Sequence, residues 1–353
     1  MFVAAPLVLG VAGSTVSAQA PDGRWVRLAP YPQPTQEIGG AVTANGKLYI
    51  LGGYGENAGG LAGWFNEYDP ATDQWTKKHD IPNPVHHMAM TGYNGKVYVF
   101  GGGTQPTPDG GNWFPSNGSW EYTPETDEWR ALAPMPTKRG GGFAVELGGK
   151  IYVIGGSGYH PGQTEDVSIS ASVPHRSLGT NEVYDPATNS WETRMAMNVP
   201  RNHLAGGAVN GKIYAIGGRV GWSFVGSSSV DTVEEYDPAT DRWRVRSRML
   251  YPRSGMAFGS DGRLIYALGG EYLDTEMVGV FRNLEAYDPA RDRWYSLPPM
   301  SVARHGFAGA VVGNRFHAVT GQMQSGIAGG GAGSTEAHEA FEIETAPGAT
   351  GSR

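Results

Sequence analysis

The 353-residue chain contains no cysteine, so no disulfide can hold its fold together. It has no run of lysine or arginine and carries a formal net charge of −7, which argues against a nucleic-acid-binding surface. Neither Cys-x-x-Cys nor His-Glu-x-x-His occurs, so no sequence motif indicates a metal site. We therefore expect no metal or other cofactor.

Charged residues make up only 17% of the chain, whereas glycine (54 residues) and proline (24 residues) are abundant and 11% of the residues are aromatic. This composition is typical of an all-β protein that has many turns and a large core. The length would allow two domains, but barrels and propellers of this size form a single one.

One phrase recurs five times along the sequence. It has the form Tyr-Asp-Pro-Ala-Thr-Asp-x-Trp, with small changes, and its copies end at Trp75, Trp129, Trp191, Trp243 and Trp294. An apolar run closed by two glycines precedes each copy, at Gly52-Gly53, Gly101-Gly102, Gly155-Gly156, Gly217-Gly218 and Gly269-Gly270. Successive glycine pairs lie 49, 54, 62 and 52 residues apart. A period of this kind indicates a repeat architecture.

The residue types of one repeat predict its structure. Proline presets φ at a turn, and the neighbouring Asp and Thr side chains accept hydrogen bonds there. The glycine pair ends a strand where backbones crowd toward an axis and a Cβ would clash. Tyr and Trp are large enough to fill the space between neighbouring sheets. Each repeat is therefore predicted to be one four-stranded sheet, stacked radially against the next.

Paired glycines followed by Tyr and Trp at this period resemble the Kelch family of β-propellers, over about residues 25 to 345. The resemblance implies an all-β fold, for which we predict six blades. A sixth unit begins at Arg304, has Thr320 in place of the first glycine of its pair, and lacks a last strand. The segment Trp25–Leu28, fifty residues before Trp75, is predicted to supply that strand and close the ring.

The ends of the chain are predicted to lie outside the propeller. Residues 1–20 resemble a secretory signal, because Phe2 to Gly13 is apolar and small residues lead up to Ala20, although no basic residue precedes the apolar run. The alternative, a membrane anchor, needs roughly 20 apolar residues. We thus expect a periplasmic or secreted protein with one propeller over 21–345 and a disordered tail over 346–353.

In Kelch propellers, ligands meet the face formed by the loops after each glycine pair and the loops that enter each blade. The longest such loop, Ser157 to Thr180, carries Tyr159 and His160 and is either functional or a mobile decoration. Arg219 directly follows its glycine pair, a position that other blades fill with Tyr54, Gly103, Ser157, Glu271 and Gln322. No other blade has arginine there, which makes Arg219 a candidate for binding an anion.

Four further arginines share one position at the entrance to a blade. Aligned on the second-strand tyrosine, this position holds Gln36, Val85, Arg139, Arg201, Arg253 and Arg304. Two residues before the third-strand aromatic, the blades hold Asn66, Trp120, Glu182, Glu234, Glu285 and Glu339. Two interpretations are open. The arginines form an anion trap, as related human Kelch domains use such arginines to hold acidic peptides, or each pairs with the glutamate of its own blade.

Histidine and aromatic residues complete the candidate site. His86 and His87 stand where blade two lacks the arginine, and His203 occupies the register of His87 two blades on. The candidate ligand-binding residues are Arg219, Tyr54, His86, His87, Tyr159, His160, His203, Trp222, Tyr272 and Gln322, with Arg139, Arg201, Arg253 and Arg304 as the alternative anion contacts. His87, His203 and a loop ligand such as His160 could bind a metal, but adjacent His86 and His87 point to opposite faces of a regular strand.

Three functions are compatible with these residues. The first is an exported propeller that binds an acidic small molecule, glycan or carboxylate-bearing peptide, and the second is a sugar-acting enzyme of the mutarotase, epimerase or uronate lyase type. The third is a protein-interaction scaffold. The chain resembles the sialic-acid mutarotase family at the level of the fold alone. It also resembles the propeller of galactose oxidase, but without cysteine it cannot form that enzyme's Cys–Tyr copper site.

Overall fold

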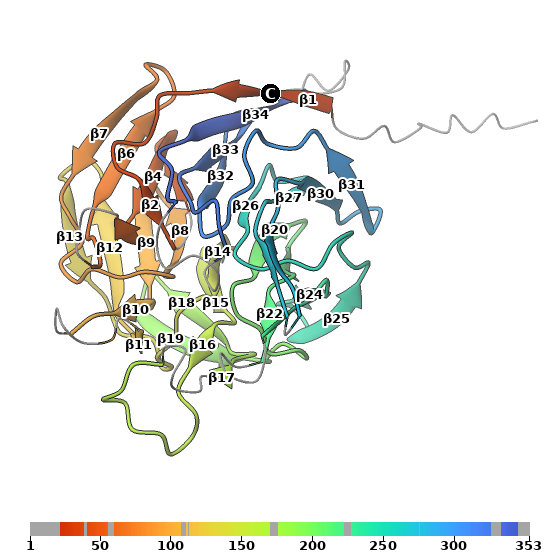
Figure 1. Cartoon of the computed structure of the whole chain (residues 1–353). Helices are drawn as coiled ribbons and strands as arrows, with labels where there is room; N and C mark the ends of the chain where they lie inside the picture. The colour runs from red at the N-terminus through yellow and green to blue at the C-terminus, as the bar shows by residue number, and fades with distance from the viewer. Residues whose placement is uncertain are drawn as a thin grey trace, which may run out of the picture.

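The computed structural model describes residues 22–38, 41–55, 60–106, 111, 113–169, 176–221, 227–274, 276–325 and 333–344. Its strands form six four-stranded antiparallel sheets arranged around one axis, as Figure 1 shows. The prediction of an all-β, six-bladed propeller is therefore confirmed. Within these ranges, no helix has the length and apolar character needed to cross a membrane.

The first five blades are each continuous in sequence, and their innermost strands pack against one another around the axis. From the axis outwards, the strands of the first two blades are β3 (Ala41–Ala44), β4 (Lys47–Leu51), β6 (Phe65–Asp69) and β7 (Gln74–Lys78), then β8 (Ala89–Tyr93), β9 (Lys96–Phe100), β12 (Ser119–Thr123) and β13 (Glu128–Ala131). The next three are β14 (Phe143–Leu147), β15 (Lys150–Ile154), β18 (Asn181–Asp185) and β19 (Ser190–Arg194); β20 (Ala205–Val209), β21 (Lys212–Ile216), β24 (Val233–Asp237) and β25 (Arg242–Arg246); and β26 (Ala257–Ser260), β27 (Ile265–Leu268), β30 (Leu284–Asp288) and β31 (Arg293–Leu297).

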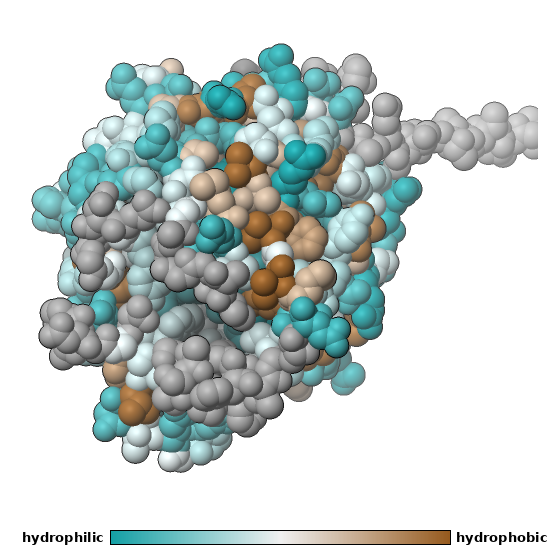
Figure 2. All heavy atoms as spheres, in the orientation of Figure 1, coloured by the Kyte–Doolittle hydropathy of each residue, from teal (hydrophilic) through white to brown (hydrophobic). Residues whose placement is uncertain are grey.

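Short two-stranded ribbons form in the loops that follow the glycine pairs, and in the first blade such a loop pairs with the segment that enters the blade. They pair β2 (Thr35–Gln36) with β5 (Tyr54–Gly55), β10 (Gly103–Thr104) with β11 (Phe114–Pro115), β16 (Ser157–Gly158) with β17 (Arg176–Ser177), β22 (Arg219–Val220) with β23 (Ser228–Ser229), and β28 (Glu271–Leu273) with β29 (Val278–Val280). On the face turned to the viewer in Figure 2, apolar residues gather near the middle of the molecule among polar ones.

The sixth blade joins the two ends of the chain. Its strands are β32 (Ala308–Val312), β33 (Arg315–Val319), β34 (His338–Glu344) and, outermost, β1 (Asp22–Arg27). Figure 1 shows β1 beside β34 at the rim, and the rings of Trp25 and Phe341 lie 5.6 Å apart across this pair. The predicted closure by the N-terminal strand is confirmed, although the strand begins three residues earlier than expected.

Two buried histidines link the sixth blade to the segment after β1. The ring nitrogens Nδ1 of His317 and Nε2 of His338 lie 2.9 Å apart, and Nδ1 of His338 lies 3.0 Å from the carbonyl oxygen of Ala29. A carbonyl can only accept, so His338 carries its proton on Nδ1 and accepts at Nε2 from His317. Burial, the largest cause, lowers the pKa of His317 to about 3 and that of His338 to about 4.

The repeated phrase connects each blade to the one before it. In the first blade the hydroxyl of Tyr68 donates to the carboxylate of Asp73 (2.7 Å), which also accepts from the backbone N–H of Ala29 (2.9 Å). The indole N–H of Trp75 donates to the carbonyl of the same Ala29 (3.0 Å). Equivalent bonds recur at the other four copies, so the phrase joins neighbouring blades as well as forming a turn.

A candidate site at the mouth of the propeller axis

The four blade-entry arginines lie inside their blades. Their side chains are at most 2% exposed, and each forms an ion pair with the glutamate of its own blade: Arg139 with Glu182, Arg201 with Glu234 (2.9 Å), Arg253 with Glu285 (2.9 Å) and Arg304 with Glu339 (2.7 Å). Guanidinium N–H groups also donate to the carbonyls that begin the glycine turns, as Arg253 does to Gly269 (2.9 Å). These contacts support the interpretation that each arginine pairs with the glutamate of its own blade. The four guanidinium groups are buried and do not form a surface that a ligand could reach.

In the first blade, the residue at the arginine position differs from the one that the repeat alignment predicts. The carbonyl of Thr35 accepts from the second glycine of the preceding blade, Gly321 (3.0 Å), as the carbonyl of Arg139 accepts from Gly102 (2.9 Å). Thr35, and not Gln36, thus occupies the arginine position. The first blade has one additional residue before its second-strand tyrosine, which shifted the alignment.

Two residues after the arginine position, the loops that enter the six blades form a ring of backbone hydrogen bonds. The six residues of this axial ring are Glu37, His87, Gly141, His203, Gly255 and Gly306. Each N–H donates to the carbonyl of the preceding member over 2.7 to 3.1 Å, and Glu37 closes the circle on Gly306 (2.7 Å). All six have positive φ, between 52° and 73°. The ring fixes six equivalent positions around one mouth.

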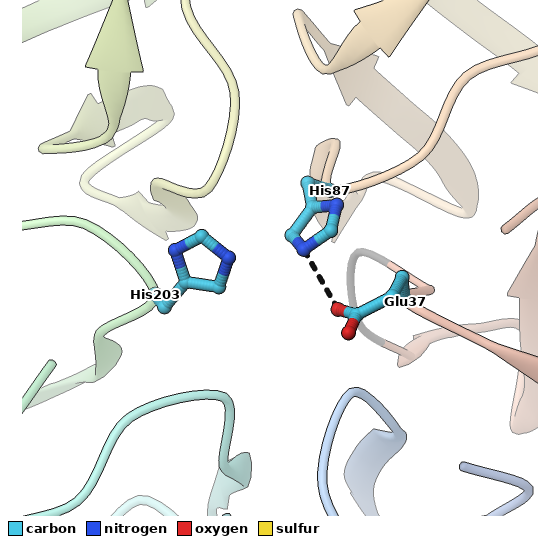
Figure 3. Close-up of side chains that lie close together, drawn as sticks. All are labelled: Glu37, His87 and His203. Carbon is cyan, nitrogen blue, oxygen red and sulfur yellow. Dashed lines mark ion pairs between the residues drawn. The ribbon is translucent and has the colours of Figure 1, made fainter. Parts of the chain in front are cut away.

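Three of the ring positions carry side chains, and these converge. Glu37, His87 and His203 each offer a ligand atom, and the three atoms lie within 4.8 Å of one another. Figure 3 shows that they come from three separate loops and face a common space, with His87 between the other two. Nε2 of His87 lies 2.7 Å from a carboxylate oxygen of Glu37, and the rings of His87 and His203 lie 4.6 Å apart.

The glycines of the ring make room for these side chains. A Cβ on Gly306 would lie 2.9 Å from the carboxylate carbon of Glu37, and one on Gly141 would lie 3.2 Å from Nδ1 of His203. A pocket opens here, lined by the ring residues and by apolar side chains such as Met256 and Phe258. The axis is therefore hollow where the three polar side chains meet.

An arginine contacts His203 at this pocket and is paired with a second carboxylate. Arg219 donates to Glu271 (2.7 Å) and to the side-chain oxygen of Asn202 (3.2 Å), and its remaining terminal nitrogen lies 2.8 Å from Nε2 of His203. Glu271 also accepts from the hydroxyl of Ser325 (2.8 Å). The predicted candidate Arg219 thus lies at the mouth, with 15% of its side chain exposed, but it is already paired with a buried carboxylate.

His305 joins the two carboxylates. Its Nε2 lies 3.2 Å from Glu37 and 3.7 Å from Glu271, and only 1% of its side chain is exposed. Burial alone would raise the pKa of Glu37, but His87 and His305 hold it well below its usual range. Burial would lower the pKa of His305, but Glu271 and Glu37 raise it. The mouth therefore contains a carboxylate whose pKa is lowered next to a histidine whose pKa is raised, and such perturbed groups are common in functional sites.

Aromatic rings cover one side of the histidines. The indole of Trp113 lies 4.6 Å from the ring of His86 and 4.7 Å from that of His87, and the ring of Tyr54 lies 4.7 Å from His86. The predicted candidates His86, His87, His203 and Tyr54 are thus brought together. His86 and His87 contact each other because His87 has a φ of 52°, so the pair is not on a regular strand and does not point to opposite faces.

The remaining candidates are not part of the convergent group of Glu37, His87 and His203. The hydroxyl of Tyr159 donates to carbonyls of its own loop, at Glu165 (3.1 Å) and Val167 (3.2 Å), and that of Tyr272 donates to Asp274 (2.6 Å). Gln322 forms a backbone bridge with His305. His160 is not in the convergent group, where Glu37 takes the place expected for it. Trp222 lies outside the described residues, as do the predicted signal segment and the tail.

Four residues of the mouth were not predicted, namely Glu37, Trp113, Glu271 and His305. Glu37 was not predicted because the additional residue in the first blade places it out of register with His87 and His203 when the repeats are aligned on the second-strand tyrosine. His305 directly follows an entry arginine, just as His86 directly follows Val85, and this correspondence was a signal that could have been used. Nothing in the repeat indicates that Trp113 turns toward the axis.

Comparison with models of known protein families identifies the same repeats that form the blades. Models of the Kelch motif match residues 39–78, 84–136, 200–250 and 252–301, and a second Kelch-motif model matches 138–197. These matches cover most of the propeller, and the chain therefore belongs to the Kelch-repeat family.

Relatives of the chain carry the same repeats in longer proteins. Kelch-like protein terF of Aspergillus terreus is 27% identical over 80% of this chain and 61% of its own length, and Kelch-like protein 23 of Homo sapiens is 27% identical over 78% and 43%. The chain thus spans about half the length of these curated relatives. A solved structure titled "Structure of YjhT" superimposes with a TM-score of 0.66 at 18% identity, over 87% of this chain and 95% of that one, which shows a shared fold.

Proposed function

We propose that the mouth of the axis binds a small acidic sugar or a similar hydroxy-carboxylate. The observation that carries this proposal is the chain of contacts from Arg219 through Glu271 and His305 to Glu37, which lines the axial pocket. The rings of Trp113 and Tyr54 pack against His86, next to His87. Recognition sites for polar ligands combine apolar walls with a few convergent polar groups. A sugar needs hydrogen-bond donors and acceptors together, and this mouth supplies both.

Charge balance distinguishes this ligand from a simple anion. Two carboxylates, Glu37 and Glu271, face Arg219 and His305. They raise the pKa of His305, and a proton on this histidine would make the mouth close to neutral. A bare anion would gain little there. Three contacts engage Arg219 within the described residues, whereas a guanidinium has five N–H donors, so it retains donors for a ligand carboxylate. The glutamates would accept from hydroxyl groups.

The test is a comparison of glucuronate with glucose by isothermal titration calorimetry. We expect glucuronate to bind and glucose to bind much more weakly, because only glucuronate offers a carboxylate to Arg219. Arg219→Gln should remove this preference, whereas Arg248→Gln, an exposed arginine paired with Asp231, should keep it. Equal binding of the two sugars, or unchanged glucuronate binding by Arg219→Gln, would contradict the proposal.

A second function, that of a sugar-acting isomerase or lyase, is favoured by one specific observation. Glu37 is held ionised between His87 (2.7 Å) and His305 (3.2 Å), and the pKa of Glu37 is lowered while that of His305 is raised. Groups whose pKa values are pushed apart can serve as base and acid in one reaction. NMR of anomeric exchange in a bound uronate checks this function. Catalysed exchange that is lost in Glu37→Gln would support an isomerase, and exchange at the uncatalysed rate would exclude a mutarotase.

We also propose that the protein is exported, on the basis of residues 1–20. Cleavage after Ala20 would leave a mature chain that begins immediately before β1. Mass spectrometry of the protein purified from its native host checks this, because an intact N-terminus on the mature protein would contradict cleavage.

A further inference from the structure

We propose that Glu37, His87 and His203 form a binding site for one divalent transition-metal ion on the propeller axis. The proposal rests on the axial ring and its side chains, and it does not depend on the acidic sugar. Two imidazoles and one carboxylate are a ligand set that Zn²⁺ and related first-row ions take in proteins, with further positions left open to water or substrate.

The first support is the distribution of side chains around the ring. All six ring positions have positive φ, which strains any residue except glycine. Three blades have glycine there, whereas the three that do not are those whose side chains converge. Backbone strain that is kept at only some of several equivalent positions indicates a role for the side chains there. Packing does not explain it, because glycine serves the other blades.

The second support is the geometry of the donor atoms. The three ligand atoms lie within 4.8 Å of one another without any ion. Around a tetrahedral ion with bonds of about 2.1 Å they would be about 3.4 Å apart, so small side-chain rotations would suffice. The contact between Nε2 of His87 and the carboxylate of Glu37 (2.7 Å) already brings two of the ligand atoms together.

The surrounding residues orient the two imidazoles. Nδ1 of His203 lies 2.5 Å from the side-chain oxygen of Asn202, which fixes the proton on Nδ1 and makes Nε2 the nitrogen that carries the lone pair. Nδ1 of His87 contacts Nδ1 of His86. Hydrogen bonds of this kind to the second ring nitrogen are the usual support of metal-bound histidine.

Arg219 opposes the ion and thereby gives the proposal a distinctive test. Its guanidinium donates to Nε2 of His203 (2.8 Å), so a metal must displace that N–H group and tolerate the nearby positive charge. Removing the guanidinium should therefore tighten metal binding. The same change should weaken the binding of an acidic sugar, so the two proposals predict opposite effects of Arg219→Gln.

The experiment is a titration of the chelator-treated full chain with Zn²⁺ by calorimetry, and with Co²⁺ by visible absorption. We expect one ion per chain, a cobalt spectrum in the visible range, and no comparable binding of Mg²⁺ or Ca²⁺, which prefer oxygen ligands. His87→Gly and His203→Gly should each weaken zinc binding at least about 100-fold, since a lost ligand should cost no less than a lost supporting residue. Arg219→Gln should strengthen it several-fold.

The variants are chosen so that they fold. Glycine occupies three of the six ring positions, so His→Gly at the other positions suits the backbone. Thermal unfolding in excess chelator should confirm that each variant matches the parent. His79→Gln serves as the control, because this histidine is 76% exposed and lies outside the ring. Zinc binding that persists at parental affinity in both glycine variants, or the absence of zinc heat and cobalt spectrum in the parent, would overturn the proposal.

Discussion

Acidification from pH 7 to pH 5 should destabilise the propeller through the buried pair His317 and His338. Both histidines have folded-state pKa values far below the unfolded value of about 6.5, at about 3 and about 4. At pH 5 the unfolded chain therefore binds protons that the folded chain excludes. Stability that is complete above the unfolded pKa is lost progressively as the pH falls below it.

The size of the effect follows from the pKa differences. Each histidine contributes about 2 kcal/mol of lost unfolding free energy at pH 5, so the pair contributes about 4 kcal/mol. The structural reason is that protonation puts a second N–H on each ring. His338 already donates to Ala29 and accepts from His317, and a proton on its Nε2 would set two donors against each other.

The assay is urea unfolding of the parent and of His317→Phe at pH 7 and pH 5. Phenylalanine suits this position, which is filled by tyrosine in the other blades. The hydroxyl of Tyr49, for example, donates to Glu67 on the next strand (2.7 Å), but the residue opposite His317 is Ala340, so no partner would be lost. The variant should lose at least about 2 kcal/mol less than the parent between the two pH values. Other titrating groups are common to both proteins and cancel in this difference. An equal pH dependence in the two proteins would refute the reasoning.

Three further perturbations test the fold. Arg253→Met should lower the unfolding free energy by about 3 to 5 kcal/mol, because it leaves the buried Glu285 without its partner. Adding Glu285→Leu should restore much of the loss, and chemical denaturation of both variants measures the two effects. Gly92→Ala should destabilise the contact between the first two blades, because its Cβ would lie 2.0 Å from the carbonyl oxygen of Thr43, and a rise in melting temperature would contradict this. Deleting residues 22–27 should lower the melting temperature by several degrees, because it removes the outermost strand of the sixth blade; an unchanged melting curve would show that the strand does not contribute to closure.

The parts of the structure that could be predicted depend on periodic sequence. Because the repeated phrase keeps its spacing, it specifies the number of blades, and the missing last strand indicates that the N-terminal segment closes the ring. The Arg–Glu pairs could also be predicted, since arginine and glutamate occur in the same four blades. The Arg–Glu pairs lie within one blade, where sequence distance translates directly into spatial distance. Ring closure joins the two ends of the chain and could be predicted because the sixth repeat lacks one strand.

The candidate site was predicted only in part, for a physical reason. His87 and His203 belong to blades two and four, and they meet only because the ring brings all six entry loops to one axis. Glu37 could not be assigned to this group while one additional residue in the first blade went unrecognised. The conformation of His87 was also hidden, because positive φ at a histidine cannot be derived from its sequence neighbours.

The axial ring has a consequence for how such propellers can be modified. Its six positions are linked by backbone hydrogen bonds, which do not depend on the side chains that the positions carry. A new set of ligands could therefore be placed on the ring without altering a strand or a loop length. A Kelch propeller with glycine at all six of these positions would have no ring side chain to bind a ligand. Introducing one glutamate and two histidines there would show whether the ring alone is sufficient to build the site.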